Sequence, residues 1–211
     1  IANRIKRYDS VGWQVAVHTQ GDRAISETLD AFEKSGIPKN SRHRLEHCLL
    51  PSKKDIQRMA KLGVSPSFHI NHLWYYGEAL EDHIIGRERT DKILPLKAAE
   101  NNSLIFSLHA DQPMFESNPL SLLHTAVNRK TRDGKIVGKS NKITVEQGLK
   151  SLTINAAWQI KMENKIGSIK PGKYADFVII DQNPMMVDPE KIKDIHVLQT
   201  IVNGNIIYKK D

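Results

Sequence analysis

The chain has 211 residues, 39% of them hydrophobic and 26% charged, which is the balance of a globular protein with one sizeable core. Its net charge is +7, but the basic residues are scattered without interleaved aromatics, which speaks against nucleic-acid binding. The single cysteine, Cys48, excludes an intrachain disulfide, and no apolar run approaches the roughly 18 residues that span a bilayer. We therefore expect a cytoplasmic protein that binds neither membranes nor nucleic acids.

The first part of the chain predicts repeated units of strand, loop and helix. Short apolar runs of strand type are followed or preceded by apolar residues at helical spacing. Asp22 is a candidate cap for the first of these helices. The loop after the third run is long and aromatic, which favours a lid or pocket wall. The expected strands are residues 13–18, 43–47, 64–69 and 104–109, the expected helices are residues 24–32, 52–62, 90–101 and 119–127, and the loop covers residues 71–76.

The later part of the chain changes its pattern near residue 163. Residues 129–142 are rich in Lys, Arg and Gly and predict a solvated excursion, and residues 145–160 predict one amphipathic helix. Beyond residue 163, short apolar runs alternate with turns. The pair Asn203-Gly204 between two such runs is a strong hairpin signal. A β-rich module is therefore expected at the C-terminal end.

Residues able to bind a metal or move a proton stand at the ends of three predicted strands. His18, His47 and Asp111 offer two imidazoles and a carboxylate, a set suited to Zn²⁺ or a similar divalent ion. One such histidine alone is more often structural, but three in the same topological position favour an active site at the C-terminal ends of parallel strands. Asp111 could also serve as the general base, or cap the following helix instead.

Neighbouring residues have weaker signals. Alternation along the strand predicts that Glu46 points away from the interior, whereas His109 shares a face with Asp111 and could support a ligand or fill the interior. His69 could contact the substrate or be a packed structural residue. Trp74 could shape the pocket or cover the sheet end, and for His72 the covering role is favoured. Cys48 is interpreted as a small buried hydrophobe.

Five motifs together resemble the second half of a metal-dependent amidohydrolase, specifically the amidohydrolase 3 branch. The most particular is the first, His-Thr-Gln-Gly-Asp-Arg-Ala, whereas the last is common to many amidohydrolases. The resemblance covers essentially the whole chain. The motifs are residues 17–24 (VHTQGDRA), 44–48 (RLEHC), 110–113 (ADQP), 153–157 (TINAA) and 167–178 (GSIKPGKYADFV).

The resemblance implies an α/β fold: the C-terminal half of a (β/α)8 TIM-like barrel over residues 1–163, then part of a small β-sandwich domain over residues 164–211. His18 and His47 would be metal ligands after barrel strands five and six, and His69 would end strand seven. Asp111 would be the metal-binding general base after strand eight. Metal-activated water would attack a carbonyl carbon and cleave a non-peptide C–N bond of a small molecule.

The chain also departs from the family pattern. The His-x-His pair after strand one and the strand-four ligand have no counterpart, and His109 stands where the branch commonly has a small residue. Four βα units leave a barrel open, so we expect pairing with a second copy or with a missing N-terminal half. Two alternatives stay open: a regulatory or binding protein that has lost catalysis, and an inactive truncated fragment.

Overall fold

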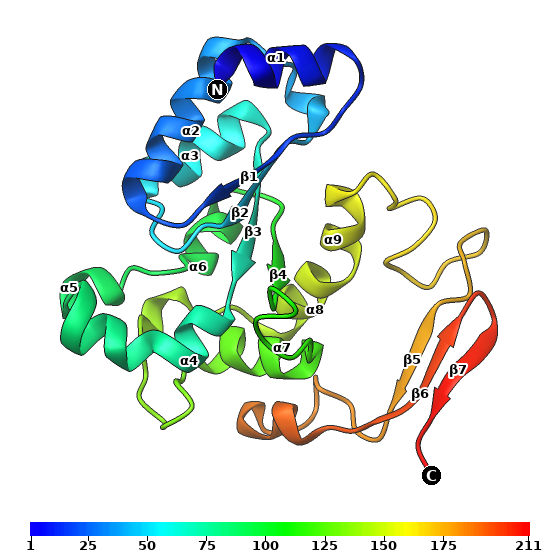
Figure 1. Ribbon diagram of the computed structural model, residues 1–211. Coiled ribbons are helices and arrows are strands. Elements are labelled where there is room, and N and C mark those ends of the chain that lie inside the picture. Colours follow the sequence, from blue (N-terminus) through cyan, green and yellow to red (C-terminus); the bar gives the residue numbers. More distant parts are fainter.

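The computed structural model describes residues 1–211 and contains two separate sheets (Figure 1). The first has four parallel strands in the order β1-β2-β3-β4, and the second has three antiparallel strands in the order β5-β6-β7. The strands are β1 (Ala16–Thr19), β2 (Arg44–His47), β3 (Ser65–His69), β4 (Ser107–His109), β5 (Phe177–Ile180), β6 (Val197–Val202) and β7 (Asn205–Lys209).

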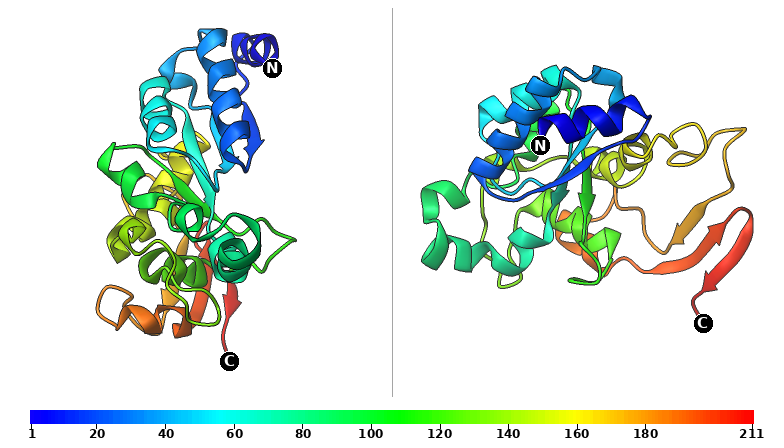
Figure 2. Two further views of the ribbon diagram at one scale, coloured as in Figure 1. Left: turned by 90° about the vertical axis from the view of Figure 1, so that its left-hand side faces the viewer. Right: turned by 45° about the horizontal axis from the view of Figure 1, so that its top comes forward.

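Helices connect the parallel strands and cover one side of their sheet. Figure 2 shows the first three helices packed together beside β1 and β2. The α-helices are α1 (Ala2–Ser10), α2 (Asp22–Ser35), α3 (Lys53–Leu62), α4 (Asn71–Ala79), α5 (Arg87–Thr90), α6 (Leu96–Asn101), α7 (Pro119–Asn128), α8 (Val145–Leu152) and α9 (Ile154–Gln159). The shorter turns are η1 (Lys39–Ser41), the π-helical η2 (Leu80–Ile84), η3 (Lys139–Asn141) and η4 (Pro189–Asp194).

The helix-covered face of the parallel sheet carries the main hydrophobic core. A single cluster of 27 buried residues joins strand residues such as Leu45 and Phe68 to helix residues such as Phe32 and Met59. Each of these four side chains is fully buried. At roughly 1.5–3 kcal/mol for each large apolar side chain removed from water, this cluster dominates the stability of the fold.

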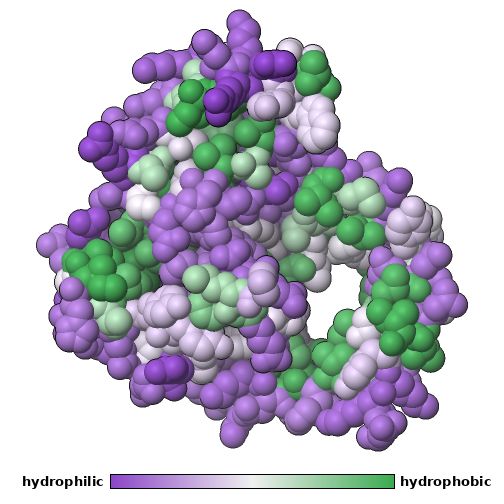
Figure 3. Space-filling model, viewed as in Figure 1, coloured by the Kyte–Doolittle hydropathy of each residue, from purple (hydrophilic) through white to green (hydrophobic).

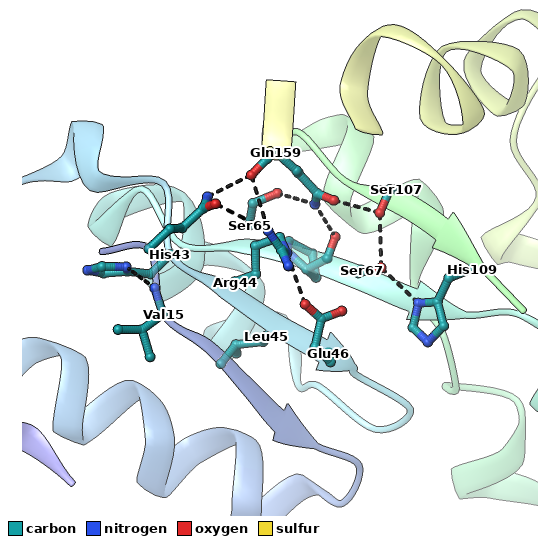
Figure 4. A network of polar contacts seen from close by, with 12 residues as sticks. Val15, His43, Arg44, Leu45, Glu46, Ser65, Ser67, Ser107, His109 and Gln159 are labelled. Carbon is teal, nitrogen blue, oxygen red and sulfur yellow. Dashed lines mark hydrogen bonds and ion pairs between the residues drawn. The ribbon is translucent and has the colours of Figure 1, made fainter. Parts of the chain in front are cut away.

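The opposite face of the parallel sheet, which we call the inner face, is polar (Figure 4). The register sets Glu46 beside Ser67, and Arg44 on the same face donates to Glu46 Oε1 at 2.9 Å and to the Gln159 carbonyl at 3.3 Å. The prediction that Glu46 points away from the interior is therefore wrong. The reason is that His47 has a left-handed backbone (φ 72°), so the alternation does not run from His47 back into the strand.

Side-chain caps stabilise the starts of α3, α7 and α8. Ser52 and Asp55 form a reciprocal capping box at the start of α3, and the Asn118 side chain accepts from two amides of the first turn of α7. Asp22, predicted as a cap, is instead the first residue of α2, and Gly21 holds the cap position. Because α7 begins after Asn118, capping by Asp111 is also excluded.

The aromatic loop predicted over residues 71–76 is wrong, because this segment forms the first turns of α4. Its residues His72 and Leu73 are buried. Gly77 in the same helix packs so closely that an added Cβ would come within 2.7 Å of the Thr131 methyl group. Tertiary packing thus stabilises a helix that the local sequence pattern does not predict.

Two predicted helices are each divided. Residues 90–101 separate into the end of α5 and α6, with Pro95 immediately before α6. Residues 145–160 separate into α8 and α9 at Thr153, whose backbone (φ −127°, ψ −94°) is not helical. This break redirects α9, so that its last residue, Gln159, lies against the inner face.

The excursion predicted over residues 129–142 is solvated at its tip and at residues 139–140, but its base is buried. Arg129 at its start is fully buried, and its guanidinium donates to the carbonyls of Ile93, Leu94 and Val137 at 2.8–3.1 Å. The bonds to Ile93 and Leu94 fix the segment to the turn before α6, and the bond to Val137 joins two parts of the segment to each other. The prediction is therefore wrong for the base of the segment.

The antiparallel sheet is largely exposed. The predicted hairpin is confirmed: β6 and β7 are joined at Asn203 and Gly204, both with positive φ as a type I′ turn requires. Ile206 and Ile207 on β7 are 58% and 64% exposed, and Figure 3 shows apolar surface on this sheet beside an opening in the molecule. A cavity of about 1050 Å³ separates this sheet from α7, α8 and α9.

The fold is α/β, as predicted, with parallel strands joined through helices and the antiparallel sheet after them. The closed barrel and the sandwich stay predictions for a larger assembly, since a four-stranded parallel sheet with two free edges is open. None of the helices combines the length and the apolar character that crossing a bilayer demands.

Candidate metal centre at the C-terminal ends of the parallel strands

Three histidines converge where β2, β3 and β4 end. His47, His69 and His109 each bring one ring nitrogen to within 4.8 Å of the others. Their ring centroids are 5.0–5.6 Å apart. The parallel register causes this convergence, because it sets His69 directly beside His109 and places all three strand ends at one edge of the sheet.

His18 and Asp111 lie on the solvent side of this cluster. The His18 ring stands 4.4 Å from the His47 ring in an edge-on arrangement, and its side chain is exposed. Asp111 is also exposed, and its negative charge opposes the lowering of the pKa of His47 and of His109. The structure thus brings His18 against the cluster and sets Asp111 near enough to act on it electrostatically.

The backbone at this rim is unusual. His47, Cys48 and Asp111 all have left-handed backbone conformations, with φ of 72°, 46° and 59°. Left-handed conformations are uncommon for residues other than glycine and cost free energy. Such positions often mark sites where geometry serves function.

Burial keeps the clustered imidazoles neutral. It lowers the pKa of His69 to about 3, with further lowering by the neighbouring His72, His109 and His47, and it lowers the pKa of His109 to about 4. The pKa of His47 is lowered too, by burial and then by His18. Neutral imidazole is the form that binds a metal ion.

The donor set fits a divalent cation. His69 is fully buried, and neither of its ring nitrogens has a hydrogen-bond partner. Leaving a buried polar group unpaired is costly, and a bound ion is one arrangement that would satisfy such a group. Imidazole nitrogens with a nearby carboxylate are ligands that Zn²⁺ and other borderline ions favour.

The surroundings of the cluster orient its rings. His109 Nδ1 lies 2.7 Å from the Ser67 hydroxyl, and His109 Nε2 lies 3.3 Å from His47 Nδ1. His72, expected to cover the sheet end, is buried with its ring 4.0 Å from that of His69, and its Nε2 is held by Gln20 at 2.8 Å.

The aromatic side chains of α4 divide between two sides. The Trp74 ring packs 5.6 Å from His124 and under Lys193, so the structure does not bring it to the histidine cluster. Tyr75 stacks on Phe115 at 4.6 Å, and Phe115 lies 5.3 Å from His69. Phe115, which the sequence did not single out, therefore supplies the aromatic surface beside the cluster.

Cys48 is confirmed as a small buried hydrophobe. It is fully buried, and burial raises the pKa of its thiol to about 12. A thiol held protonated in this way is a poor nucleophile at neutral pH. Cys48 is therefore excluded as a nucleophile, and the reactive groups at this rim are the imidazoles of the cluster and the carboxylate of Asp111.

Comparison with known proteins identifies the family. The model of the amidohydrolase family, in its amidohydrolase 3 branch, matches residues 1–208. The chain belongs to the amidohydrolase family. This confirms the resemblance drawn from the five motifs.

Relatives of this amidohydrolase chain include enzymes. It is 28% identical to N-substituted formamide deformylase of Arthrobacter pascens and 28% identical to the putative amidohydrolase YtcJ of Bacillus subtilis. These matches cover 97% and 98% of the chain but 38% and 39% of the relatives. The chain thus spans about two fifths of the length of the relatives it matches.

A solved structure supports the same fold. An uncharacterised metal-dependent hydrolase from Pyrococcus horikoshii superposes with a TM-score of 0.75 at 26% identity, over 89% of this chain and 38% of that one. Most of this chain thus has the fold of the matching part of that metal-dependent hydrolase.

Proposed function

We propose that this chain supplies part of the metal centre of a hydrolase that cleaves an amide-type, non-peptide C–N bond. The observation that carries the proposal is the convergence of His47, His69 and His109 within 4.8 Å, with a buried His69 that has no partner. Family membership supports it, as does a relative whose name describes the deformylation of N-substituted formamides.

We assign the divalent ion to His18, His47 and Asp111, with His69 and His109 as further donors beside them. Zn²⁺ is the first choice because imidazole and carboxylate ligands suit it. Such an ion supplies Lewis acidity, which polarises a carbonyl group and acidifies water. Because the pKa values of His47 and His69 are lowered, these imidazoles are neutral at neutral pH and each has a nitrogen lone pair that can bind the ion.

Asp111 acts as the general base and then as the general acid. Its carboxylate is exposed at the rim, where it can accept the proton from an attacking water. The water oxygen bonds to the carbonyl carbon, the C–N bond breaks, and Asp111 passes the proton to the departing nitrogen. Asp111→Asn would keep the shape of the side chain and remove this proton transfer.

The substrate carries an apolar or aromatic group. Tyr75 and Phe115 form an aromatic surface next to His69, and Tyr76 adds a third ring 5.9 Å from Phe115. The Trp74 ring, which we expected to contact the substrate, packs against His124. We therefore propose that Tyr75, Tyr76 and Phe115 contact the substrate. Phe115→Ala is expected to raise KM for such substrates, and Trp74→Ala to leave KM closer to that of the parent.

Metal content measured by elemental analysis tests the proposal. We expect a divalent metal in the parent chain, reduced in His18→Ala, His47→Ala and Asp111→Ala. His83→Ala, which removes an exposed histidine on η2, is the matched control and should retain the metal. A parent that folds normally without metal would contradict the hydrolase and favour a regulatory or binding protein that keeps the fold.

We also propose that residues 1–163 and 164–211 belong to different domains of a larger assembly. The free edges of the parallel sheet and the exposed apolar residues of β7 support pairing with a second copy or with the complementary half of a barrel. Light scattering of the 211-residue chain distinguishes these cases, because a self-completing chain will be a dimer.

A further inference from the structure

A chain of buried polar groups crosses the inner face and begins at Gln159 on α9 (Figure 4). Gln159 is 3% exposed, and its Nε2 donates to the Pro66 carbonyl at 2.8 Å and to Ser65 Oγ at 2.5 Å. A backbone carbonyl can only accept, so the amide nitrogen must face Pro66. The amide orientation is thereby fixed, and Oε1 faces Ser107.

The direction of each following proton can be worked out in turn. Ser107 Oγ lies 2.6 Å from Gln159 Oε1, which can only accept, so the single Ser107 proton is used there. Ser67 Oγ lies 3.0 Å from Ser107 Oγ, which has no second proton to give. Ser67 must therefore donate its own proton to Ser107.

The last step fixes the ring of His109. Ser67 Oγ is 2.7 Å from His109 Nδ1 and has already given up its proton, so it can only accept here. His109 Nδ1 must therefore carry a proton. In a neutral imidazole the other nitrogen is then unprotonated, so Nε2 presents a lone pair. That nitrogen is the one 3.3 Å from His47 Nδ1.

We propose that Ser67, Ser107 and Gln159 are positioning residues that hold His109 as the Nδ1–H tautomer and so aim its Nε2 lone pair into the histidine cluster. A metal-ligating histidine commonly donates its other ring N–H to a fixed acceptor, which sets the tautomer and the ring orientation. His109 is thus prepared as an additional metal ligand. Only this ligand role rests on the proposed function; the tautomer does not.

Nitrogen-15 NMR of the histidine rings, recorded on the metal-free 211-residue chain, reads the tautomer directly. We expect a protonated Nδ1 and an unprotonated Nε2 for His109, assigned by the loss of its signals in His109→Gln. A protonated Nε2, or a mixture of both tautomers, would overturn the proposal. The measurement on the parent requires no variant of the positioning residues.

Two serine variants separate positioning from general support of the fold. Ser107→Ala removes the acceptor of the Ser67 proton, which can then turn to His109 Nδ1, so the single tautomer should be lost. Ser65→Ala is the matched control: Ser65 is 1% exposed and bonds the same amide, but Pro66 still orients Gln159. Equal effects of both variants on the tautomer would contradict the proposed relay.

Addition of zinc to the same samples tests the ligand role. We expect the His109 Nε2 resonance to move while Nδ1 stays protonated, and zinc affinity to fall about tenfold more in Ser107→Ala than in Ser65→Ala. Zinc binding that leaves the His109 resonances unchanged would overturn the ligand role. If the parent shows the expected tautomer but binds no zinc, the proposed metal centre fails and the relay is supported.

Discussion

The two sheets of this chain differ in how their apolar residues are used. The parallel sheet buries Leu45 and Phe68 completely under helices, within one core of 27 residues. The antiparallel sheet contributes no strand residue to either buried cluster, and Ile206 and Ile207 on β7 are more than half exposed. Both sheets have paired strands, although each strand pair of the antiparallel sheet contains a register shift, so strand pairing alone does not determine how much a sheet stabilises the protein.

The two sheets therefore have different roles: the parallel sheet stabilises the chain, and the antiparallel sheet offers a surface for assembly. The parallel sheet forms its core within the chain, and the polar groups of its inner face are free to build a site. The antiparallel sheet keeps an apolar surface of the kind that marks an interaction site. Mutations at matched positions in the two sheets should therefore differ strongly in cost.

The largest expected effect is in the core of the parallel sheet. Phe68→Ala should reduce the free energy of unfolding by about 3–5 kcal/mol, because it leaves a cavity against Phe106 in a region without solvent access. Urea denaturation followed by circular dichroism measures this loss. A loss below about 1 kcal/mol would contradict the view that this core dominates stability.

Acid should destabilise the protein through His43, behind the parallel sheet. Its Nδ1 accepts from the Val15 amide, and burial lowers its pKa, although Asp9 opposes this. In the unfolded state the His43 imidazole has a pKa near 6.5, which is above its pKa in the folded state. As the pH falls, the unfolded state therefore binds the proton before the folded state does. The contribution of His43 to the free energy of unfolding is complete only above about pH 6.5. We expect a decrease of up to about 1.4 kcal/mol per pH unit from this residue as the pH falls below about 6.5.

Denaturation curves for His43→Gln on both sides of about pH 6.5 measure this contribution as a shallower pH dependence. His83→Gln is the control, because His83 is an exposed histidine on η2. Equal slopes for the parent and His43→Gln would rule out the effect.

A helix cap beneath the parallel sheet should have a smaller effect. Ser52→Ala removes the side chain that accepts from the Asp55 amide at the start of α3, and should cost about 1 kcal/mol. Ser52→Gly should cost only a few tenths of a kcal/mol. Thermal denaturation of both variants measures the difference, and a larger loss for glycine would be inconsistent with a capping role.

The smallest effect is expected in the antiparallel sheet. Ile207→Ala should change stability by less than about 0.5 kcal/mol, because the side chain is 64% exposed. The experiment is a denaturation series at several protein concentrations. A loss that grows with concentration would instead show that this sheet is covered by another molecule in solution.

Much of the fold could be predicted from local patterns. The four parallel strands and the hairpin at Asn203 have short apolar runs bounded by turn residues, and these signals are local. The helix of residues 71–79 was missed because its stability comes from packing, such as the close fit of Gly77 against Thr131. The break at Thr153 has no proline or glycine to announce it.

The candidate site was partly accessible from sequence. His18, His47 and His69 could be recognised because each ends a predicted strand, and strand ends of a parallel sheet meet at one edge. Gln159 and Ser107 had no such signal: serines in strands are common, and the two residues are separated by 52 positions. Only the packing of α9 against the sheet brings them together.

The left-handed backbone at His47, Cys48 and Asp111 has a consequence for directed evolution. Each costs roughly 1 kcal/mol or more relative to glycine at the same position. A library selected for heat resistance alone would therefore gain by substituting glycine at His47 and Asp111, and would discard these proposed ligands as the protein became more stable, whereas glycine at the buried Cys48 would leave a cavity in the core. Selection schemes for this chain need a functional screen at every round, because thermal survival and the proposed chemistry select for different residues at His47 and Asp111.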